Sequence, residues 1–368
     1  MLIHMIAALS LDSNLPVTFA VPSTDGVIVH GQADRPEVSS IGAVVMVAGT
    51  GPFDRDVMFG EPGGEPTPVF LDMARRLNAR GITAIRYDKR GVRFRAEPGR
   101  RLDRIEAVTA TTDRMRDDLG AVYNWTRASD GLGAQCVAFF GHSEGFAHIG
   151  RLAATGAPAP AAVVGMGALL TDPVRNFRWN LAERDSWSLR ALDTDGDGVT
   201  TNEEVRSGLS STPAAVNGVI EPYLAPDGVW TAEDIADLDR RWNDLYPALR
   251  AQALAAPDEG PWPNAEQPLG SMQWSKSWYL DEVPVARNLA LWDTPVIAHL
   301  GERDSQTHPA LQQEAGARFL GERLKIVVHA GLGHTLGLHP TYGPMQADAA
   351  DAMADELYLA LQRCQFAS

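Results

Sequence analysis

The five-residue motif at positions 141–145 (GHSEG) constrains this chain of 368 residues more than any other feature. An apolar, strand-like run at 135–140 comes directly before it, and a segment with a helical pattern at 144–155 begins inside it. Glycines two residues to each side of the serine suit a sharp turn, because bulkier side chains would collide there. The motif therefore predicts a strand, a tight turn with Ser143 exposed at its apex, and a helix.

An acid and a histidine follow Ser143 at the ends of two further strand-like runs. Residues 295–300 (PVIAHL) lead into a loop with Asp304, and residues 324–329 (LKIVVH) lead into a glycine-rich loop with His334. A serine hydroxyl is a poor nucleophile at neutral pH unless a histidine accepts its proton and a carboxylate orients that histidine. We expect Ser143, His334 and Asp304 to be nucleophile, base and acid.

Other side chains could fill the roles of acid and base. Glu302 and Asp293 flank the same strand as Asp304, and the further histidines of this region are His299, His308, His329 and His339. None of them combines a strand end with the order serine, acid, histidine as well as the expected pair does. Taken alone, Asp304 could be a turn former and His334 a loop histidine bonded to backbone.

A catalytic serine also needs backbone N–H donors for the charge that develops on the substrate oxygen. One is expected at Glu144, directly after the serine. The second is expected where the apolar run 44–48 enters the turn-rich segment 49–52 (GTGP), with Thr50 as the first candidate and Gly51 as the next. The alternative interpretation of this segment is an ordinary Gly-Pro turn.

Several stretches resemble one family in the same order along the chain. Residues 47–56 (VAGTGPFDRD) are similar to the G-S-G-P-x-D-R-D stretch of a bacterial esterase and acyl-hydrolase group related to the serine aminopeptidase-like hydrolases. The stretches 86–91, 141–145, 301–304 with Gln306, and 333–334 match the same group. The chain departs from it at Ala48, where many relatives carry histidine. The resemblance implies an α/β-hydrolase fold and a serine-hydrolase triad.

The pattern of elements agrees with that fold. Strand-like runs at 17–22, 26–32, 44–48, 82–87, 135–140 and 162–166 alternate with helical stretches at 68–79, 112–127 and 144–155, and a closing helix is expected at 347–362. Such alternation predicts a mostly parallel sheet flanked by helices. The segment 171–291 is too long for a simple connection. We predict a core formed by residues 1–170 and 292–368, with an inserted, mainly helical cap at 171–291.

Most tryptophans lie in or beside the predicted cap. They are Trp179, Trp187, Trp230, Trp242, Trp262, Trp274, Trp278 and Trp292, eight of the nine in the chain. Large aromatic side chains could line a pocket for an apolar acyl or aryl group. They could equally fill the small core of a helical cap. We expect most of them to do so, and two or three to face substrate.

Residues 193–204 (DTDGDGVTTNEE) match the twelve-residue calcium-loop pattern of EF-hands in full. The expected ligands are Asp193, Asp195, Asp197, the carbonyl of Val199, and Glu204. Thr200 stands where an apolar residue is usual, and no second loop of this pattern is visible. The alternative is a solvated Asp/Gly turn followed by a capping box of Thr201 and Glu204, which leaves three alternating aspartates unexplained. We predict a structural Ca²⁺ ion and no organic cofactor.

Charge and cysteine content bear on partners and compartment. The formal net charge of −15 opposes nucleic-acid binding. One basic cluster could steer an anionic substrate, but we expect it to pair with acidic residues; its members are Arg86, Lys89, Arg90, Arg93, Arg95, Arg100, Arg101 and Arg104. Cys136 and Cys364 suggest no disulfide framework. The apolar start at 1–9 lacks the basic flank of a signal peptide, and no run is long enough to span a membrane. We expect a cytoplasmic protein, with periplasmic or secreted locations left open.

The prediction is a serine hydrolase that cleaves carboxylic esters through an acyl-enzyme intermediate, on small to medium substrates with an apolar portion. An acyl-CoA thioesterase or a serine peptidase is the alternative, since thioester and amide cleavage use the same groups. A non-catalytic, calcium-responsive binding protein is the third possibility, although it would have no use for a base aligned with an exposed serine. The sequence carries no signal for oligomeric state.

Overall fold

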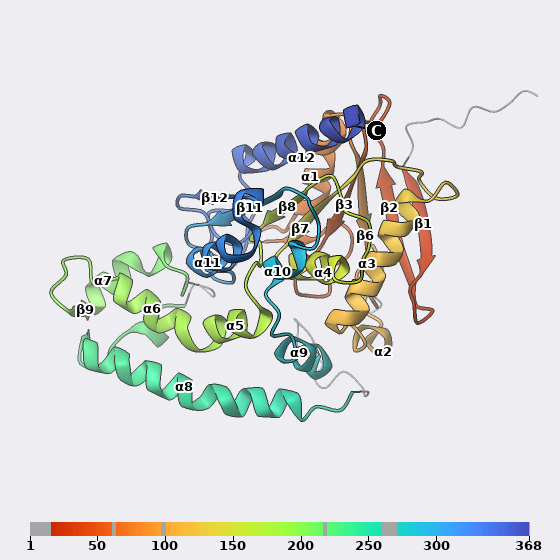
Figure 1. Ribbon diagram of the computed structural model, residues 1–368. Coiled ribbons are helices and arrows are strands. Elements are labelled where there is room, and N and C mark those ends of the chain that lie inside the picture. Colours follow the sequence, from red (N-terminus) through yellow and green to blue (C-terminus); the bar gives the residue numbers. More distant parts are fainter. Residues whose placement is uncertain (1–15, 61–63, 97–100, 216–218, 259–270, 368) are drawn as a thin grey trace, which may run out of the picture.

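The computed structural model describes residues 16–60, 64–96, 101–215, 219–258 and 271–367. Its centre is an eight-stranded sheet in the order β1-β2-β6-β3-β7-β8-β11-β12 (Figure 1). The strands are β1 (Val17–Pro22), β2 (Ile28–Asp34), β3 (Ala43–Val47), β6 (Thr83–Tyr87), β7 (Val137–His142), β8 (Val163–Met166), β11 (Val296–Gly301) and β12 (Leu324–His329). Strand β2 pairs antiparallel with β1 and β6, and the other neighbours are parallel. The predicted α/β fold is confirmed.

The burial of the strands follows their place in the sheet. Strands β3, β7 and β8 are buried at every position, as parallel strands covered on both faces should be. The edge strand β1 alternates between exposed and buried side chains instead. These central strands are the ones whose apolar runs the sequence marks most clearly, and their carboxyl ends all point to one edge of the sheet.

Helices cover both faces of the sheet, and each face has its own core. Helices α1 (Val69–Ala79) and α12 (Ala347–Ala367) pack on one face through side chains such as Phe70, Met73 and Leu357. Helices α3 (Thr112–Arg127), α4 (Glu144–Ala153), α10 (Val285–Leu289) and α11 (Pro309–Leu320) cover the other. The spacing of buried residues along α1 is that of one apolar helix face.

The chain between β8 and β11 is mainly helical. It contains α5 (Pro173–Arg178), a π-helical turn (Trp179–Glu183), α6 (Arg184–Ala191), β9 (Val199–Thr201), α7 (Asn202–Gly208), β10 (Val229–Thr231), α8 (Ala232–Leu254), α9 (Met272–Tyr279) and α10. In Figure 1 the part from α5 to α8 forms an arm beside the sheet, while α9 lies below α4. The arm has a small core of its own, which includes Leu189, Val205 and Ile235. The division of the chain at 171 and 291 stays a prediction.

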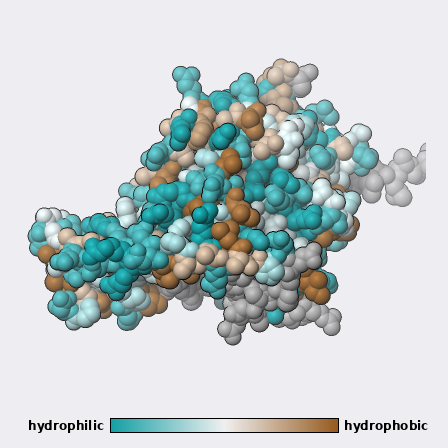
Figure 2. Space-filling view, turned by 60° about the horizontal axis from the view of Figure 1, so that its bottom comes forward, coloured by the Kyte–Doolittle hydropathy of each residue, from teal (hydrophilic) through white to brown (hydrophobic). Residues whose placement is uncertain are grey.

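Figure 2 views the molecule with its lower side turned forward. The surface of the arm is mostly hydrophilic, and apolar surface gathers near the middle of this face. Among the helices of the described residues, none is both long and apolar enough to cross a lipid bilayer.

The remaining short elements lie outside the central sheet. They are the two-stranded ladder of β4 (Met58–Phe59) and β5 (Thr67–Pro68), helix α2 (Arg104–Ala107), and 3-10 turns at Leu209–Ser211, Glu221–Tyr223 and Gly321–Arg323. Neither the ladder nor α2 is predicted from the sequence, because segments this short carry almost no periodic signal. Of the residues considered in the sequence analysis, the apolar segment 1–9, Arg100 and Trp262 lie outside the described residues.

Five of the seven described members of the basic cluster pair with acidic side chains, as expected. Arg86 contacts Asp34 and Asp56, and Arg90 contacts Asp25 and Asp118. The other ion pairs of the cluster are Lys89 with Glu144, Arg93 with Asp103, and Arg101 with Asp54. Arg95 lies over the ring of Phe94 instead. Because Arg86 and Arg90 are almost fully buried, their carboxylate partners are needed to offset the cost of burying charge.

The two cysteines form a disulfide, although the sequence suggested no disulfide framework. Cys136 precedes β7 and Cys364 lies in the last turns of α12, with their Cα atoms 5.9 Å apart. Because they stand 228 residues apart in the chain, only the packing of α12 across the sheet brings them together. Two cysteines with no characteristic spacing gave no sequence signal for this bond.

We expect the disulfide to contribute about 2–5 kcal/mol to the free energy of unfolding, because it restricts a long loop in the unfolded chain. Thermal unfolding with and without reductant measures this contribution. The Cys364→Ser variant should unfold at the temperature of the reduced wild type and should not respond to reductant. An unfolding temperature that is the same for wild type, reduced wild type and variant would contradict the expectation.

Candidate active site

Ser143 lies at the apex of the turn between β7 and α4. Its backbone has φ 53° and ψ −122°, a strained conformation for a residue with a side chain. The turn is packed closely against the neighbouring strand: a methyl group on Gly145 would lie 2.2 Å from the Val47 carbonyl oxygen. Helix α4 can approach β3 only if residue 145 lacks a side chain. The strand, turn and helix predicted from the motif are all present.

Asp304 and His334 form a buried pair. The Nδ1 atom of His334 lies 2.9 Å from both carboxylate oxygens of Asp304. Asp304 follows β11 and is fully buried, and His334 follows β12 with 5% of its surface exposed. The carboxylate also accepts bonds from the backbone N–H groups of Gln306 and Thr307 and from the Thr307 hydroxyl. These donors fix the carboxylate, so that His334 can present its other ring nitrogen, Nε2, away from the acid.

The His334 ring lies beside the turn that holds Ser143. The N–H of Ser143 donates to the Met166 carbonyl at 3.1 Å, and a methyl group on the next residue, Gly167, would lie 2.7 Å from the His334 ring. The ring centre of His142 is 5.0 Å from that of His334. Among the described residues, the Ser143 hydroxyl makes no hydrogen bond to His334. The structure therefore brings the three predicted residues to one edge of the sheet without a direct serine–histidine bond.

The segment after β3 passes close to the serine. A methyl group on Gly49 would lie 2.9 Å from Ser143 Cβ. Thr50 and Gly51 follow directly, and in the described part of the chain their N–H groups donate to no backbone carbonyl. The N–H of Glu144 is at the first position of α4, where no partner exists within the helix. All three predicted oxyanion donors thus belong to segments that adjoin Ser143.

The side chain of Glu144 lies in a network that the sequence did not indicate. It is 1% exposed, and one oxygen accepts bonds from the indole N–H groups of Trp274 at 2.6 Å and Trp278 at 2.7 Å. Lys89 Nζ lies 3.4 Å from the other oxygen and donates to the Gly49 carbonyl at 2.7 Å. Glu144 sits inside the recognised motif and Lys89 inside the basic cluster, but no spacing rule connects either with two tryptophans about 130 residues away.

Charge and burial set the ionisation of this network. Burial alone would raise the pKa of Glu144, but the Lys89 ammonium and the hydrogen-bond donors outweigh it and lower the pKa to about 2. Burial lowers the pKa of His148 to about 3, although the Glu144 carboxylate acts in the opposite direction. At neutral pH the network therefore holds an anionic Glu144 and a neutral His148, with Lys89 as the cation next to the carboxylate.

His142 is a second buried imidazole beside the serine. Burial holds the pKa of His142 well below its usual range, and His334 and Lys89 act in the same direction. Neither of its ring nitrogens has a hydrogen-bond partner among the described residues. Its ring packs edge-on against Phe59. His142 is therefore neutral and fills space behind the turn.

The alternative acids and bases are engaged elsewhere. His299 lies between His329 and Glu356, at 2.9 and 2.7 Å. The Glu302 carboxylate accepts a bond from the Gly331 N–H. The remaining alternatives are Asp293, which is exposed, His308, which packs between Trp179 and Trp187, and His339, which accepts bonds from two backbone N–H groups.

The tryptophans of the inserted segment serve several purposes. Trp179, Trp278 and Trp292 are buried, and Trp187 is 38% exposed. Trp230 donates its indole N–H to the Tyr223 carbonyl inside the arm. Trp242 lies, partly buried, at the edge of a second cluster in the arm. Among the described tryptophans, Trp230 and Trp242 pack against the small cores of the arm, whereas Trp274, Trp278 and Trp292 belong to or pack against the core on the sheet. The expectation that most of them fill the core of the cap is therefore wrong.

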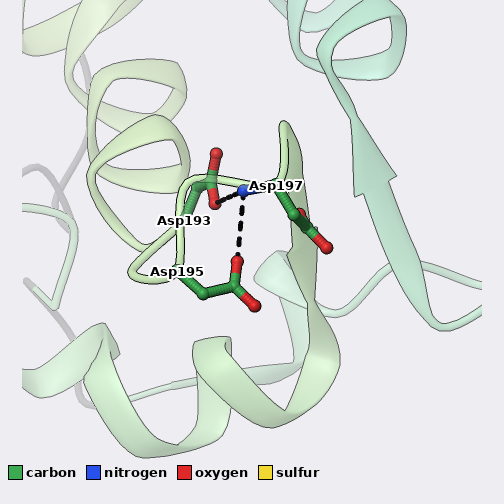
Figure 3. Close-up of side chains that lie close together, drawn as sticks. All are labelled: Asp193, Asp195 and Asp197. Carbon is green, nitrogen blue, oxygen red and sulfur yellow. Dashed lines mark hydrogen bonds between the residues drawn. The ribbon is translucent and has the colours of Figure 1, made fainter.

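The three aspartates of the predicted calcium loop lie together at the far end of the arm (Figure 3). One oxygen from each of Asp193, Asp195 and Asp197 can be chosen so that all three lie within 4.8 Å of one another. Asp193 and Asp195 also accept hydrogen bonds from the Asp197 N–H. Glu204 accepts bonds from Thr194 and Thr201 and forms the capping box of α7. The aspartates thus gather as a cation site requires, whereas Glu204 caps the helix, as the alternative interpretation predicts.

The loop has a partner that was not expected from the sequence. Strand β9, at loop positions 7 to 9, pairs antiparallel with β10, and Thr200 lies opposite Trp230. Each strand follows a glycine with positive φ and leads into a capping box, of Thr201 with Glu204 or Thr231 with Asp234. The signal was present as a weak repeat, GVTTNEE at 198–204 and GVWTAED at 228–234. The second copy does not match the calcium-loop pattern, because residues 223 and 225, which correspond to Asp193 and Asp195, are not acidic.

Comparison with known proteins agrees with the fold. No protein-family model matches the chain, and no curated protein does. Similar solved structures are a lipase in its open form (16% identity, 95% of this chain and 99% of that chain, TM-score 0.56), the proline iminopeptidase of Mycobacterium smegmatis (16%, 95% and 99%, 0.53), and a thermostable carboxyl esterase from Bacillus coagulans (15%, 95% and 98%, 0.53). At such low identity the likeness concerns the fold alone. The chain has the α/β-hydrolase fold.

We expect the Gly145→Ala substitution to destabilise the protein by about 1–3 kcal/mol or more, because the added methyl group would overlap the Val47 carbonyl. Gly120→Ala is the matched control. Gly120 lies in α3, and its added methyl group would be 3.5 Å from the nearest atom, so the substitution should raise stability by up to about 1 kcal/mol. Urea unfolding of both variants measures the difference. Equal stability of the two variants would contradict the packing argument.

Proposed function

We propose that the protein is a serine hydrolase that cleaves carboxylic esters through an acyl-enzyme intermediate. The observation that carries the proposal is the buried Asp304–His334 pair beside the strained turn of Ser143. A histidine oriented by a fixed carboxylate next to a partly exposed serine is the arrangement required for acyl transfer. The names of similar structures, which include an esterase, a lipase and a peptidase, agree with this reaction class.

In the proposed reaction, Ser143 Oγ attacks the ester carbonyl carbon, and His334 Nε2 accepts the hydroxyl proton. The Ser143 side chain has to turn toward His334 as substrate binds, which is common because catalytic hydrogen bonds often tighten only in the substrate complex. The N–H groups of Glu144 and of Thr50 or Gly51 stabilise the negative oxygen. His334 returns the proton to the departing alcohol, and water activated by His334 then releases the acid and frees Ser143.

Asp304 keeps His334 in the tautomer with the proton on Nδ1 and stabilises the imidazolium that forms during attack. The substrate proposed is small to medium in size, with an apolar portion held by aromatic side chains of the inserted segment. Phe177 and Trp274 support this, because both are only partly buried and pack together next to Glu144.

The test of this proposal is a panel of p-nitrophenyl esters, acyl-CoA thioesters and aminoacyl anilides. Wild-type protein should hydrolyse the esters, Ser143→Ala should not, and Asp304→Asn should lose about 10⁴-fold in kcat because the histidine adopts the wrong tautomer. A fluorophosphonate should label Ser143 in the wild type alone. Turnover confined to anilides or thioesters would move the assignment to peptidase or thioesterase. Turnover that persists in Ser143→Ala would overturn the mechanism.

We also propose that the loop 193–204 binds a structural Ca²⁺ ion. One oxygen from each of the three carboxylates lies within 4.8 Å of the other two, and a cation between them would offset their mutual repulsion. Asp193, Asp195, Asp197 and the Val199 carbonyl would hold the ion, and Glu204 would have to exchange its bonds to Thr194 and Thr201 for a metal bond. Hard oxygen ligands of this kind suit Ca²⁺. The ion would stabilise the arm, at a distance from the site of acyl transfer.

We expect Ca²⁺ to raise the unfolding temperature of the protein, since binding to the folded state alone stabilises it. Calorimetric titration should show one site, which Asp193→Asn and Asp195→Asn remove. Asp227→Asn is the matched control. Asp227 is exposed and lies just before β10, outside the aspartate cluster. No heat of binding at millimolar Ca²⁺, or equal loss in the control, would contradict the site.

The Cys136–Cys364 disulfide favours a compartment that permits disulfide formation over the cytoplasm expected from the sequence. We therefore propose an oxidising environment for the mature protein. Alkylation with a thiol reagent in denaturant, without reduction, distinguishes the two environments in the protein taken from its native source, because Cys136 is buried in the folded chain. A disulfide-bonded chain takes up no reagent, and a reduced chain takes up two equivalents.

A further inference from the structure

The carboxylate of Glu144 is buried directly behind the proposed nucleophile. It is 1% exposed, and it accepts hydrogen bonds from Lys89 after β6 and from two indoles of α9. His148, one turn along α4, lies 3.6 Å from the carboxylate without a hydrogen bond. Burying a carboxylate is costly unless charge and hydrogen bonds offset the loss of water. These contacts fix the position of the Glu144 side chain.

Lys89 connects this carboxylate to the first candidate donor of the oxyanion hole. Its ammonium donates to the Gly49 carbonyl at 2.7 Å and lies 3.4 Å from Glu144. The Gly49 carbonyl and the Thr50 N–H belong to one planar trans peptide, in which C=O and N–H point in opposite directions. A lysine that holds this carbonyl therefore also sets the direction of the Thr50 N–H.

Glu144 carries the other candidate donor on its own backbone. Its side chain is held by the indole N–H groups of Trp274 and Trp278, which stand four residues apart and so lie on one face of α9. The helix is anchored in turn, because Ser271 at its start bonds to the Val108 carbonyl and Ser277 accepts a bond from the Thr112 N–H. Phe177 of α5 stacks on Trp278. The inserted segment thus supplies two of the hydrogen-bond donors that stabilise a buried negative charge next to the nucleophile.

We propose that Glu144, Lys89, Trp274 and Trp278 form a positioning network that orients both oxyanion donors and makes acyl transfer depend on the docking of α9. The inference rests on the proposed function. These side chains act through the backbone N–H groups of Glu144 and Thr50 and are positioning residues, since none of them has to touch the reacting atoms. A displacement of either N–H by about 1 Å can cost up to about 10²-fold in rate.

The ionisation of the network supports this role. Its charged or titratable members are Glu144, Lys89 and His148, with Arg151 acting on His148 from the next turn of α4. The pKa of Glu144 is about 2, so the carboxylate is ionised at neutral pH. Loss of the indole donors removes two of the influences that lower this pKa, so the carboxylate would begin to protonate at a higher pH. The contribution of the ionised carboxylate to kcat is lost as pH falls through that raised pKa.

The experiment compares kcat and KM for the best ester substrate in Trp274→Phe, Trp278→Phe and the double variant. Phenylalanine keeps an aromatic ring but removes the N–H donor. We expect kcat to fall about tenfold in each single variant and up to about 10²-fold in the double variant. The KM should stay within about twofold, because donors to the transition state have little influence on ground-state binding. The acid limb of the kcat profile should move to higher pH, and it should move furthest in the double variant.

Trp292→Phe is the matched control. Trp292 is buried like Trp278 and donates its indole N–H to the Ala157 carbonyl, away from Glu144. Its substitution should lower the unfolding temperature without changing kcat or the pH profile. If the indole variants of α9 do not fold, Lys89→Met and Lys89→Arg replace them, with a loss of up to about 10²-fold in kcat expected for methionine and a smaller loss for arginine, which keeps the charge.

The outcomes separate the network from the proposed function. Wild-type ester turnover that is absent in Ser143→Ala supports the function, and wild-type kcat in the α9 double variant would then overturn the network alone. A fall in kcat in Trp292→Phe equal to that in Trp278→Phe would also overturn it, because the effect would be one of general packing. No Ser143-dependent turnover in the wild type would overturn both.

Discussion

The close packing of three backbone segments around residue 143 is the constraint on which the rest of the structure depends. The turn at Ser143 lies against β3 and β8, and a methyl group at Gly145, Gly49 or Gly167 would meet Val47, Ser143 or His334 within 3 Å. Interiors packed this tightly cannot relax around an added atom without shifting the backbone. The strained φ of Ser143 persists because these neighbours determine it, and so the serine, the histidine loop and the segment after β3 meet at one place.

Several charged side chains are buried in this fold. Arg86, Arg90, Asp304 and Glu144 are all nearly or fully inaccessible to solvent. Each has partners of opposite charge or several hydrogen-bond donors, which is the condition under which a charge can be buried. Removal of one partner would leave the other unpaired in a poorly solvated site. The ionic contacts around the carboxyl edge of the sheet therefore determine geometry, whatever their net contribution to stability.

Sequence patterns predicted the sheet and most of its helices well, and the reason is periodicity. The bounds of β1, β12 and α3 agree with the predicted ranges, because each is a run of clear alternating, apolar or amphipathic character. The elements β4, β5, α2, β9 and β10 did not emerge, since each is only two to four residues long. Positions of Ser143, Asp304 and His334 followed from a motif and from strand order. The network of Lys89, Glu144 and the two tryptophans could not be predicted in this way, because no spacing rule connects its members.

The sequence by itself determined the order of strands and helices, the serine turn, the acid and histidine at the ends of two later strands, and the cluster of three aspartates. These features are local, and short-range backbone chemistry is enough to specify them. Only the tertiary structure decided that Cys136 meets Cys364 and that two indoles of α9 donate hydrogen bonds to Glu144. Contacts between distant segments depend on how the helices pack across the sheet, and the local sequence patterns do not specify that packing.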